Sequence, residues 1–275
     1  MLVTGGAGLL GGRLLATAPP GWTARGTRHR RPVRHAESFP VDLADAGAVD
    51  ALVARLRPDL VVHTAYRKQD GQRDIVAATR NVAASARRHG AALLHVSSDV
   101  VFDGEHAPYA EDAALAPVDD YGRRKAEAER WVRDTVPDAA IVRTSLIVSS
   151  DPPDRTSAWL AERLRGDDDP GLYADELRCP VHVDDLVGQL WELVGLARDQ
   201  RAGAWHLVGP EAVSRHTLGV LLAARLGLPP PRRAALSREH PGPRPRDLRL
   251  LTARADKALR TRPRPISAAL AGVGA

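Results

Sequence analysis

A glycine-rich turn directly after the first predicted strand constrains this chain more than any other feature. Met1–Thr4 is a short apolar run, and Gly5, Gly8 and Gly11 follow it at GxxGxxG spacing before a helical stretch. Glycines at these places allow a tight turn, close backbone approach to a pyrophosphate and close packing of helix on strand. The helix amino end then faces the diphosphate charge. A glycine triplet alone is also typical of an ordinary turn, but its place after a strand predicts a dinucleotide site at Gly5, Gly8, Leu9, Leu10 and Gly11.

Short β-branched runs alternate with stretches of helical spacing along the first half of the chain, as in βαβ units around a parallel sheet. Strands are predicted at 1–4, 23–28, 60–64, 92–97, 140–144 and 204–208, and helices at 46–56, 75–88 and 121–132. The second half contains a proline loop at 151–154, an acidic turn at 166–171, and helical stretches at 184–197 and 214–226. A Pro/Arg-rich run follows at 229–245, and its prolines suit neither a regular helix nor a central strand. We therefore expect an α/β fold: a Rossmann-type doubly wound parallel sheet at residues 1–148, and a smaller C-terminal α/β substrate portion at 149–275 with some segments returning to the sheet.

Charge and composition exclude several classes of protein. The formal charge is +5, yet acidic residues are interspersed with the arginines and the basic stretches lack interleaved aromatics, so we expect no nucleic-acid partner. No apolar run is long enough for a membrane helix, and the first residues leave no room for a signal peptide. With Cys179 as the single cysteine, no internal disulfide forms and no cysteine cluster can hold a metal. We expect a soluble cytoplasmic protein without a metal and without membrane contact.

The end of the second predicted strand bears on the choice between the two nicotinamide dinucleotides. An acidic residue there would hold the ribose hydroxyls, whereas this chain has Arg28 and His29. Arginine pairs bidentately with phosphate, so the sequence favours NADP(H) over NAD(H), with an exposed basic turn as the alternative. Asp42 and Leu43 lie at the end of a further strand expected between those at 23–28 and 60–64, where the carboxylate could accept from an adenine amino group or cap the helix that begins near Asp45.

Three polar residues form the candidate catalytic group. Ser98 ends a strand, and Tyr121 and Lys125 open a helix at a spacing of four, which places them on one helix face. A lysine ammonium beside a phenol favours phenolate, so we expect a lowered pKa for Tyr121. The tyrosine could then exchange a proton with a carbonyl or hydroxyl oxygen, to which Ser98 donates a hydrogen bond. Only three of the 39 basic residues are lysine, and arginine is poorly suited to this role.

These residues resemble the extended short-chain dehydrogenase/reductases, specifically the dTDP-4-dehydrorhamnose reductase branch. The resemblance runs over nearly the whole chain, through residues 5–11, 63–65, 81–83, 95–104, 121–125, 142–145, 178–186 and 205–210. It implies a Rossmann fold, an NADP-dependent oxidoreductase in which Ser98, Tyr121 and Lys125 are the triad, and a nucleotide sugar bound between the two portions. It also implies that the cofactor passes His63, Thr64 and Ala65, although His63 is equally typical of a packed core histidine.

Several residues depart from the branch. Val100 stands where the reductases usually have tyrosine, and Leu146 where they usually have tryptophan. The stretch at residues 66–70, which includes Tyr66, Arg67 and Lys68, replaces smaller residues. We expect the substrate to contact Tyr66, Arg67, Ser98, Asp99, Val100 and Leu146, and Arg178 to bind a substrate diphosphate from a loop facing the cleft. Alternatively, Val100 and Leu146 fill the core and Arg67 lies on the surface.

The activity expected from these residues is NADPH-dependent reduction of a keto group, on a 4-keto deoxysugar nucleotide or a related natural-product intermediate. Two alternatives remain open at this stage. The same triad suits a nucleotide-sugar epimerase or dehydratase, and the fold suits a regulatory protein that binds NADP without turnover. The sequence does not distinguish a monomer from a homodimer.

Overall fold

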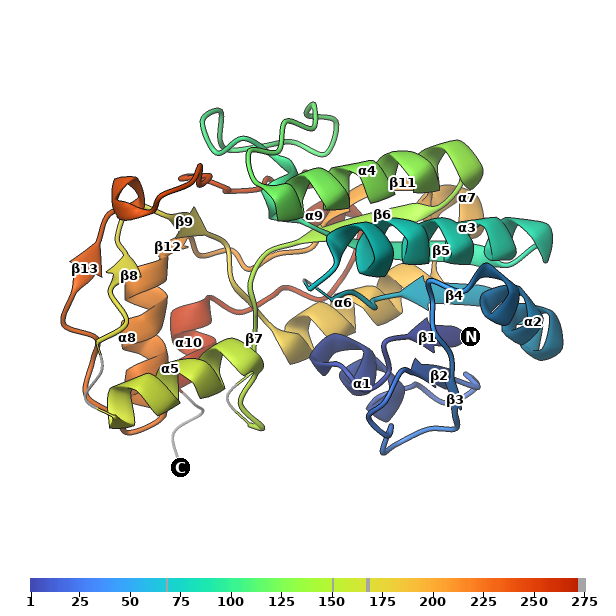
Figure 1. Cartoon of the computed structure of the whole chain (residues 1–275), viewed down its shortest axis with the longest axis horizontal. Coiled ribbons are helices and arrows are strands. Elements are labelled where there is room, and N and C mark those ends of the chain that lie inside the picture. The colour runs from blue at the N-terminus through green and yellow to red at the C-terminus, as the bar shows by residue number, and fades with distance from the viewer. Residues whose placement is uncertain (68, 150, 167–168, 272–275) are drawn as a thin grey trace.

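A seven-stranded parallel sheet forms the centre of the protein in a computed structural model that describes residues 1–67, 69–149, 151–166 and 169–271 (Figure 1). The strand order is β11-β6-β5-β4-β1-β2-β3, and every neighbouring pair is parallel. The strands are β1 (Leu2–Thr4), β2 (Arg25–Arg28), β3 (Ser38–Pro40), β4 (Leu60–His63), β5 (Ala92–Ser98), β6 (Ala140–Thr144) and β11 (Gly203–His206). The predicted Rossmann-type sheet is confirmed, and the order reverses between β1 and β4, where such sheets bind ligands.

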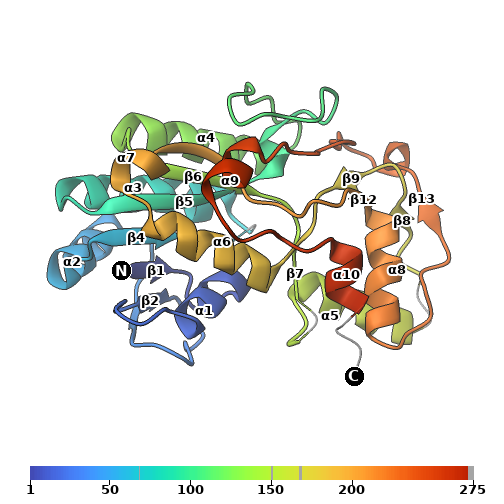
Figure 2. The ribbon, with the colours of Figure 1, turned by 180° about the vertical axis from the view of Figure 1, so that it is seen from behind.

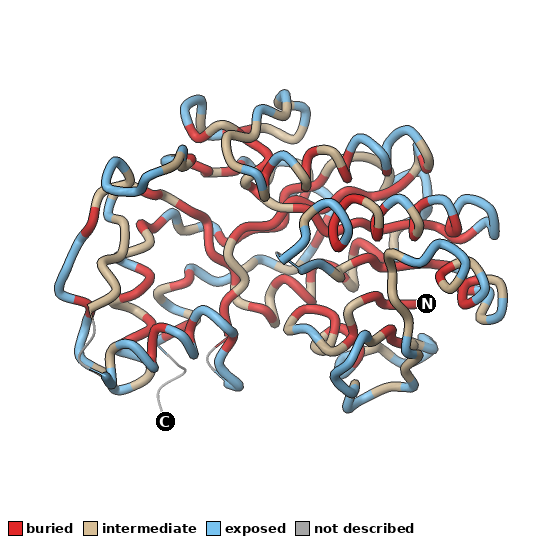
Figure 3. Tube along the Cα trace, in the orientation of Figure 1, coloured by how far each residue is buried: buried red, intermediate tan, exposed pale blue. Residues whose placement is uncertain are grey.

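Helices cover both faces of this sheet. One face carries α1 (Leu9–Ala16) and α6 (Val183–Gly195), and the other carries α2 (Ala46–Leu56), α3 (Ala78–Arg88) and α4 (Asp120–Thr135). Figure 1 shows α3 and α4 in front of the sheet, and Figure 2 shows α6 in front after the half turn. Alternate strand residues serve the two faces: Leu94 and Val142 pack toward α6, and Leu93 and Ile141 toward α3 and α4. The buried residues accordingly concentrate along the strands (Figure 3).

The predicted helix ends are close to the observed ones, with two informative differences. α2 spans the predicted residues because Asp45 accepts a hydrogen bond from the amide of Ala48 at 3.0 Å as its N-cap. The helix predicted over 75–88 instead begins as a π-helical turn, η1 (Gln72–Ala77), and continues as α3. α5 (Arg155–Arg165) was not predicted, since Pro152 and Pro153 suggest a loop, but Asp154 caps it through the amides of Thr156 and Ser157.

The second half of the chain contributes to two regions. α6 and β11 join the central layers, with the short α7 (Arg198–Arg201) and α9 (Ala253–Ala258) nearby. The remaining helices α5, α8 (Arg215–Arg225) and α10 (Ile266–Ala271) pack together on a separate core that includes Leu160, Leu218 and Ile266, at the left of Figure 1. Short strands accompany them: β7 (Ile147–Val148), β8 (Leu172–Tyr173), β9 (Leu177–Arg178), β10 (Val181–His182), β12 (Val213–Ser214) and β13 (Ala234–Ala235). Two 3-10 turns, η2 (Asp99–Val101) and η3 (Ser237–Glu239), complete the order.

Candidate active site

The glycine turn lies at the point where the strand order reverses. Gly5 has φ of +71°, and a β-carbon there would lie 2.9 Å from the Cα of Ala65, which follows β4. A β-carbon on Gly11 would lie 2.5 Å from the carbonyl oxygen of Gly5 and 2.9 Å from the hydroxyl of Thr64. Side chains at either glycine would fill the space where the two segments meet, so the glycines are required by packing as well as by the turn.

The amino end of α1 is left without a side-chain cap. Gly8 is the N-cap residue, is exposed, and has no side chain to accept from the first amides of the helix. The amides of the first turn, which include those of Leu9, Leu10 and Gly11, have no partner within the helix. Amide groups at an open helix amino end suit an anion such as a diphosphate, so the turn fits a dinucleotide.

The segment after β4 is held by Thr4 at the end of β1. The Thr4 hydroxyl accepts from the amides of Thr64 and Ala65, each at 3.2 Å, and the Thr64 hydroxyl donates to the Thr4 carbonyl at 2.7 Å. The His63 ring is buried between the hydroxyls of Thr4 at 2.7 Å and Thr79 at 3.0 Å, and burial lowers its pKa to about 3. Its ring is therefore a neutral packing group, and only its backbone borders the turn.

The residues predicted for the adenosine end lie across β1 from the catalytic candidates. Arg28 is half-buried at the end of β2 and His29 is exposed beside it. Asp42 forms an ion pair with Arg73 and accepts from the amide of Ala44, and its pKa is lowered because these bonds outweigh partial burial. Asp45, rather than Asp42, caps α2. The Leu43 carbonyl accepts from the Asn81 side chain at 3.0 Å.

An open cavity of about 490 Å³ adjoins Asp42. Its lining residues are Asp42, Ala44, Asp45, Asp70, Gln72, Arg73 and Ala77. The sequence did not point to Arg73. The residues around it in the sequence give no sign that η1 brings its side chain to Asp42, just after β3. Arg73 forms an ion pair with Asp42, the carboxylate that was predicted to contact the adenine, so this end of the site already contains an ion pair.

Ser98 ends strand β5, and Asp99 follows it as the first residue of η2. The Ser98 hydroxyl donates to the Asp99 carboxylate at 3.1 Å, and the Ser145 hydroxyl donates to its other oxygen at 2.6 Å. Asp99 is buried, and its burial raises its pKa. The charge of Arg178 and these two hydrogen bonds act in the opposite direction but do not cancel the effect of burial. Ser145, which the sequence offered only as part of a motif, thus orients the carboxyl group beside Ser98.

Lys125 is buried beneath the start of α4. Asp119 caps that helix by accepting from the amide of Gly122 at 2.6 Å, which sets Tyr121 and Lys125 on its first turns. The Lys125 ammonium donates to the Val96 carbonyl of β5 at 2.8 Å, and burial lowers its pKa to about 8. The lysine is therefore anchored to the same strand that ends in Ser98.

Tyr66 joins Tyr121 and Lys125 from the segment after β4. The ring centroids of Tyr66 and Tyr121 are 5.9 Å apart, and the Lys125 nitrogen lies 5.6 Å from the Tyr66 centroid. Tyr66 is 50% exposed, so it lies on the solvent side of this group. The lowered pKa expected for Tyr121 is wrong for this structure: burial raises it well above its usual value, and Tyr66 and Asp99 add to the increase.

Other predicted substrate contacts have different outcomes. Arg67 is exposed and paired with Asp74 through two bonds of 2.9 and 2.8 Å. Val100 and Leu146 are partly buried against separate apolar clusters. Arg178 was predicted on a loop and lies in a strand instead. It belongs to β9, is 5% exposed, and donates to the carbonyls of Leu177, Pro245 and Arg246. Lys68 lies outside the described residues.

The described ranges hold no candidate metal centre and no membrane-spanning helix. In these ranges no three His, Cys, Asp or Glu side chains are placed to hold a metal ion together. Every helix in the same part of the chain is too short or too polar to span a bilayer.

The chain is similar to known proteins over most of its length. A family model described as the RmlD substrate binding domain matches residues 1–273. The dTDP-4-dehydrorhamnose reductase of Streptomyces griseus is 31% identical over 265 residues, covering 89% of this chain and 83% of that protein. Methionine adenosyltransferase 2 subunit beta of Xenopus tropicalis is 28% identical over 260 residues, covering 89% and 77%.

A solved structure shows the same fold over almost the full length. The dTDP-4-dehydrorhamnose reductase of Bacillus anthracis, crystallised with NADP, has a TM-score of 0.81, with 20% sequence identity and coverage of 98% of this chain and 96% of that one. The family match spans both the sheet and the C-terminal helices, so the chain belongs to the RmlD substrate-binding domain family.

Proposed function

We propose that this protein is an NADPH-dependent reductase of the short-chain dehydrogenase/reductase type that acts on the keto group of a nucleotide sugar, a dTDP-linked 4-keto deoxysugar being the leading candidate. The observation that carries the proposal is the convergence of Tyr66, Tyr121 and Lys125 beside the glycine turn. The reductase name of the Streptomyces griseus relative supports the substrate class. On this proposal residues 1–148 hold the cofactor, and residues 149–275 supply the substrate portion.

The residues that would hold the cofactor follow from the open helix end and the basic strand end. The amides of Leu9, Leu10 and Gly11 would bind the diphosphate, Arg28 the ribose phosphate, and Lys125 the nicotinamide ribose hydroxyls. A bound NADPH supplies the hydride for the carbonyl carbon. The cavity beside Asp42 and Arg73 would take the adenine.

The protein's own part is the proton transfer to the carbonyl oxygen. Because burial keeps the pKa of Tyr121 high, its phenol carries the proton that a reduction consumes. Ser98 would turn its hydroxyl from Asp99 to the substrate and donate a second hydrogen bond to the same oxygen, while Ser145 keeps the Asp99 carboxylate in place beside it. When Tyr121 gives up its proton, a phenolate remains. Lys125 would stabilise this negative charge, since its ammonium is fixed nearby by the Val96 carbonyl.

Replacing Tyr121 tests the reductase proposal. The wild-type protein should oxidise NADPH with a panel of nucleotide-linked 4-keto sugars, and Tyr121→Phe should reduce kcat by about 10²- to 10⁴-fold, because it removes one general acid. NADPH affinity, measured by fluorescence titration, should change little and serves as the control for folding. Unchanged conversion by Tyr121→Phe would contradict the assignment of this residue.

Replacing Arg28 tests the cofactor proposal. Arg28→Ala should weaken NADPH binding by about 10-fold or more, the value of a charge-assisted hydrogen bond, and leave NADH binding nearly unchanged. The exposed Arg30→Ala is the matched control on the same turn. An equal loss of affinity for both dinucleotides would show that Arg28 does not contact the extra phosphate.

A non-catalytic role is the second candidate function. It is favoured by the likeness to methionine adenosyltransferase 2 subunit beta, a protein named as a subunit. A non-catalytic protein should bind NADP without converting any keto substrate. The wild-type and Tyr121→Phe measurements described above therefore separate the two candidates.

A further inference from the structure

A second tyrosine adjoins the candidate proton donor. Tyr66 follows β4, and its ring centroid lies 5.9 Å from that of Tyr121, with the two ring planes inclined by 41°. A side-chain hydrogen bond joins the two phenol groups. Tyr66 is 50% exposed, and Tyr121 is less exposed than that. The hydrogen bond therefore links Tyr121 to a residue that is open to water.

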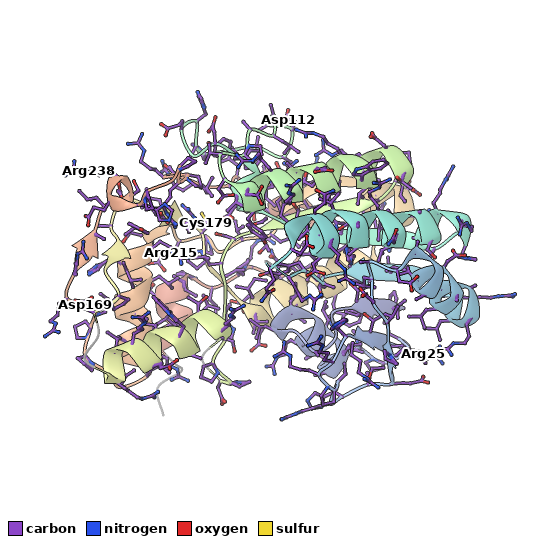
Figure 4. The ribbon with its side chains drawn as sticks, in the orientation of Figure 1. Arg25, Asp112, Asp169, Cys179, Arg215 and Arg238 are labelled. Carbon is purple, nitrogen blue, oxygen red and sulfur yellow. The ribbon has the colours of Figure 1, made fainter. Side chains whose placement is uncertain are left out.

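Three other ionisable groups in this part of the molecule are closed to water. Asp99 and Lys125 are buried, and the Lys125 ammonium donates inward to a carbonyl of β5. Cys179, labelled in Figure 4, is buried in an apolar cluster with residues of η2 and α4, and burial raises the pKa of its thiol. Tyr66 is far more exposed than any of these described groups, so it is the best placed of them to exchange a proton with solvent.

The proposed reduction leaves Tyr121 without its proton, and every further turnover needs that proton back. Bound nicotinamide and ketone would cover the side of the phenol on which the reaction takes place, and would keep water from it. A phenol hydroxyl both donates and accepts hydrogen bonds. Tyr121 can therefore donate to the ketone oxygen while it accepts from Tyr66, which leaves the route through Tyr66 open during the reaction.

The surroundings of the pair favour movement of a proton from Tyr66 to Tyr121. Burial raises the pKa of Tyr121 well above its usual value, and Tyr66 and Asp99 act in the same direction. A group with a high pKa is a strong base once it has lost its proton, so the Tyr121 phenolate draws a proton from a neighbouring phenol. The Lys125 nitrogen lies 5.6 Å from the Tyr66 ring centroid, where its positive charge stabilises the phenolate that then remains on Tyr66.

We propose that Tyr66 returns a proton from solvent to Tyr121 after each reduction. The inference rests on the proposed reductase function. In this step the O–H bond of Tyr66 breaks and its proton joins the phenolate oxygen of Tyr121, which leaves a phenolate on Tyr66. That phenolate then takes a proton from the solvent, so the proton that the reduction consumes comes from water. Tyr66 would act through Tyr121, a role distinct from the substrate contact that the sequence predicts for it.

The first and the later turnovers of Tyr66→Phe test this role, because the variant keeps the ring and loses only the hydroxyl. With the protein in excess over the keto substrate, stopped-flow oxidation of NADPH should keep the wild-type rate, since the first reduction uses the proton already on Tyr121. With substrate in excess, kcat should fall by about 10²-fold, the lower end of the range for one proton-transfer group, while kcat/KM stays constant. Imidazole at rising concentration should restore kcat, because a small acid can replace the missing phenol.

Tyr173→Phe is the matched control. It removes the same hydroxyl from a partly buried tyrosine in β8, outside the pair, and should leave all these rates unchanged. NADPH affinity, measured by fluorescence titration, checks the folding of both variants.

The outcomes separate this inference from the proposed function. If the wild type reduces no keto substrate, the proposed function is wrong and the role of Tyr66 falls with it. If the wild type is active and Tyr66→Phe has the same kcat, the reductase stands and the proton route through Tyr66 is wrong. An equal loss in the first turnover, in kcat/KM and in kcat would make Tyr66 a substrate contact or a packing residue, and a loss of kcat that imidazole does not restore would also overturn the proposal.

Discussion

At the scale of single residues, chemistry was easier to predict than environment. The spacing of Tyr121 and Lys125 and the strand-end position of Ser98 can be read from the sequence. Their burial cannot, because it depends on how α4 packs on β5. Burial reverses the predicted pKa change of Tyr121, and the carbonyls of residues 245 and 246 accept hydrogen bonds from the Arg178 guanidinium. Contacts between distant segments decide both outcomes.

The pH dependence of turnover should report Lys125. Its folded pKa of about 8 lies below the ordinary lysine value, so its charge is lost as the pH rises through about 8. We expect kcat/KM for ketone reduction to be level from about pH 6 to pH 7, to be halved near pH 8 and to fall further above it, since kcat/KM reports groups of the free enzyme. Stopped-flow measurement of NADPH oxidation checks this.

Lys125→Arg supplies the control for that profile. A guanidinium stays charged throughout this pH range, so the variant's decline should move to higher pH even if its maximum rate is lower. A decline at the same pH in both proteins would assign it to another group.

At the scale of elements, strands and helices with clear periodicity were predicted well. α2 matches its predicted range, and the six predicted strands are all present. The errors lie at element starts: the prolines before α5 suggest a loop, and the periodicity does not separate the π-helical turn η1 from α3, which follows it. The short strands β8 and β13 could not be predicted, because two-residue pairs carry no periodic pattern.

The turn between β1 and α1 should not tolerate a side chain at Gly11. Gly11→Ala should destabilise the protein by about 1–3 kcal/mol, because the added carbon meets the Gly5 carbonyl, and should weaken NADPH binding as well. Urea unfolding and fluorescence titration measure the two effects. Gly47→Ala, in α2, is the matched control: its added carbon lies 3.5 Å from Asp45, and alanine favours helix by up to about 1 kcal/mol. Equal stability of the two variants would contradict the packing argument.

At the scale of the whole molecule, the sheet encloses several histidines that stay neutral. Burial lowers the pKa of His63 to about 3 and of His206 to about 4, and lowers that of His95 well below its usual value. An unfolded chain binds protons at these sites from about pH 6.5 downward, whereas the folded protein does not. Their contribution to stability is therefore complete above about pH 6.5 and is lost as the pH falls.

Acid should accordingly destabilise the protein at pH values well above those at which most carboxylates titrate. At pH 5 each such histidine costs about 2 kcal/mol of unfolding free energy, with Asp99 acting in the opposite direction because its folded pKa is raised. Urea unfolding at pH 7.5 and pH 5 measures the difference, and His63→Gln should reduce it. His35→Gln, at an exposed histidine, is the matched control. The same loss of stability in His63→Gln as in the wild type would rule out His63 as a contributor.

Net reduction of a nucleotide-linked ketone moves a hydride from NADPH to the carbonyl carbon, and isotope labelling follows that hydride. Wild-type protein would be incubated with dTDP-4-dehydrorhamnose and NADPH carrying deuterium at the transferred position of the nicotinamide. A reductase forms one equivalent of NADP⁺ for each deuterium found on the former carbonyl carbon, and Tyr121→Phe should lose both signals. Conversion of the sugar without NADPH oxidation or deuterium uptake would instead identify an epimerase or dehydratase, and the protein would not be a reductase.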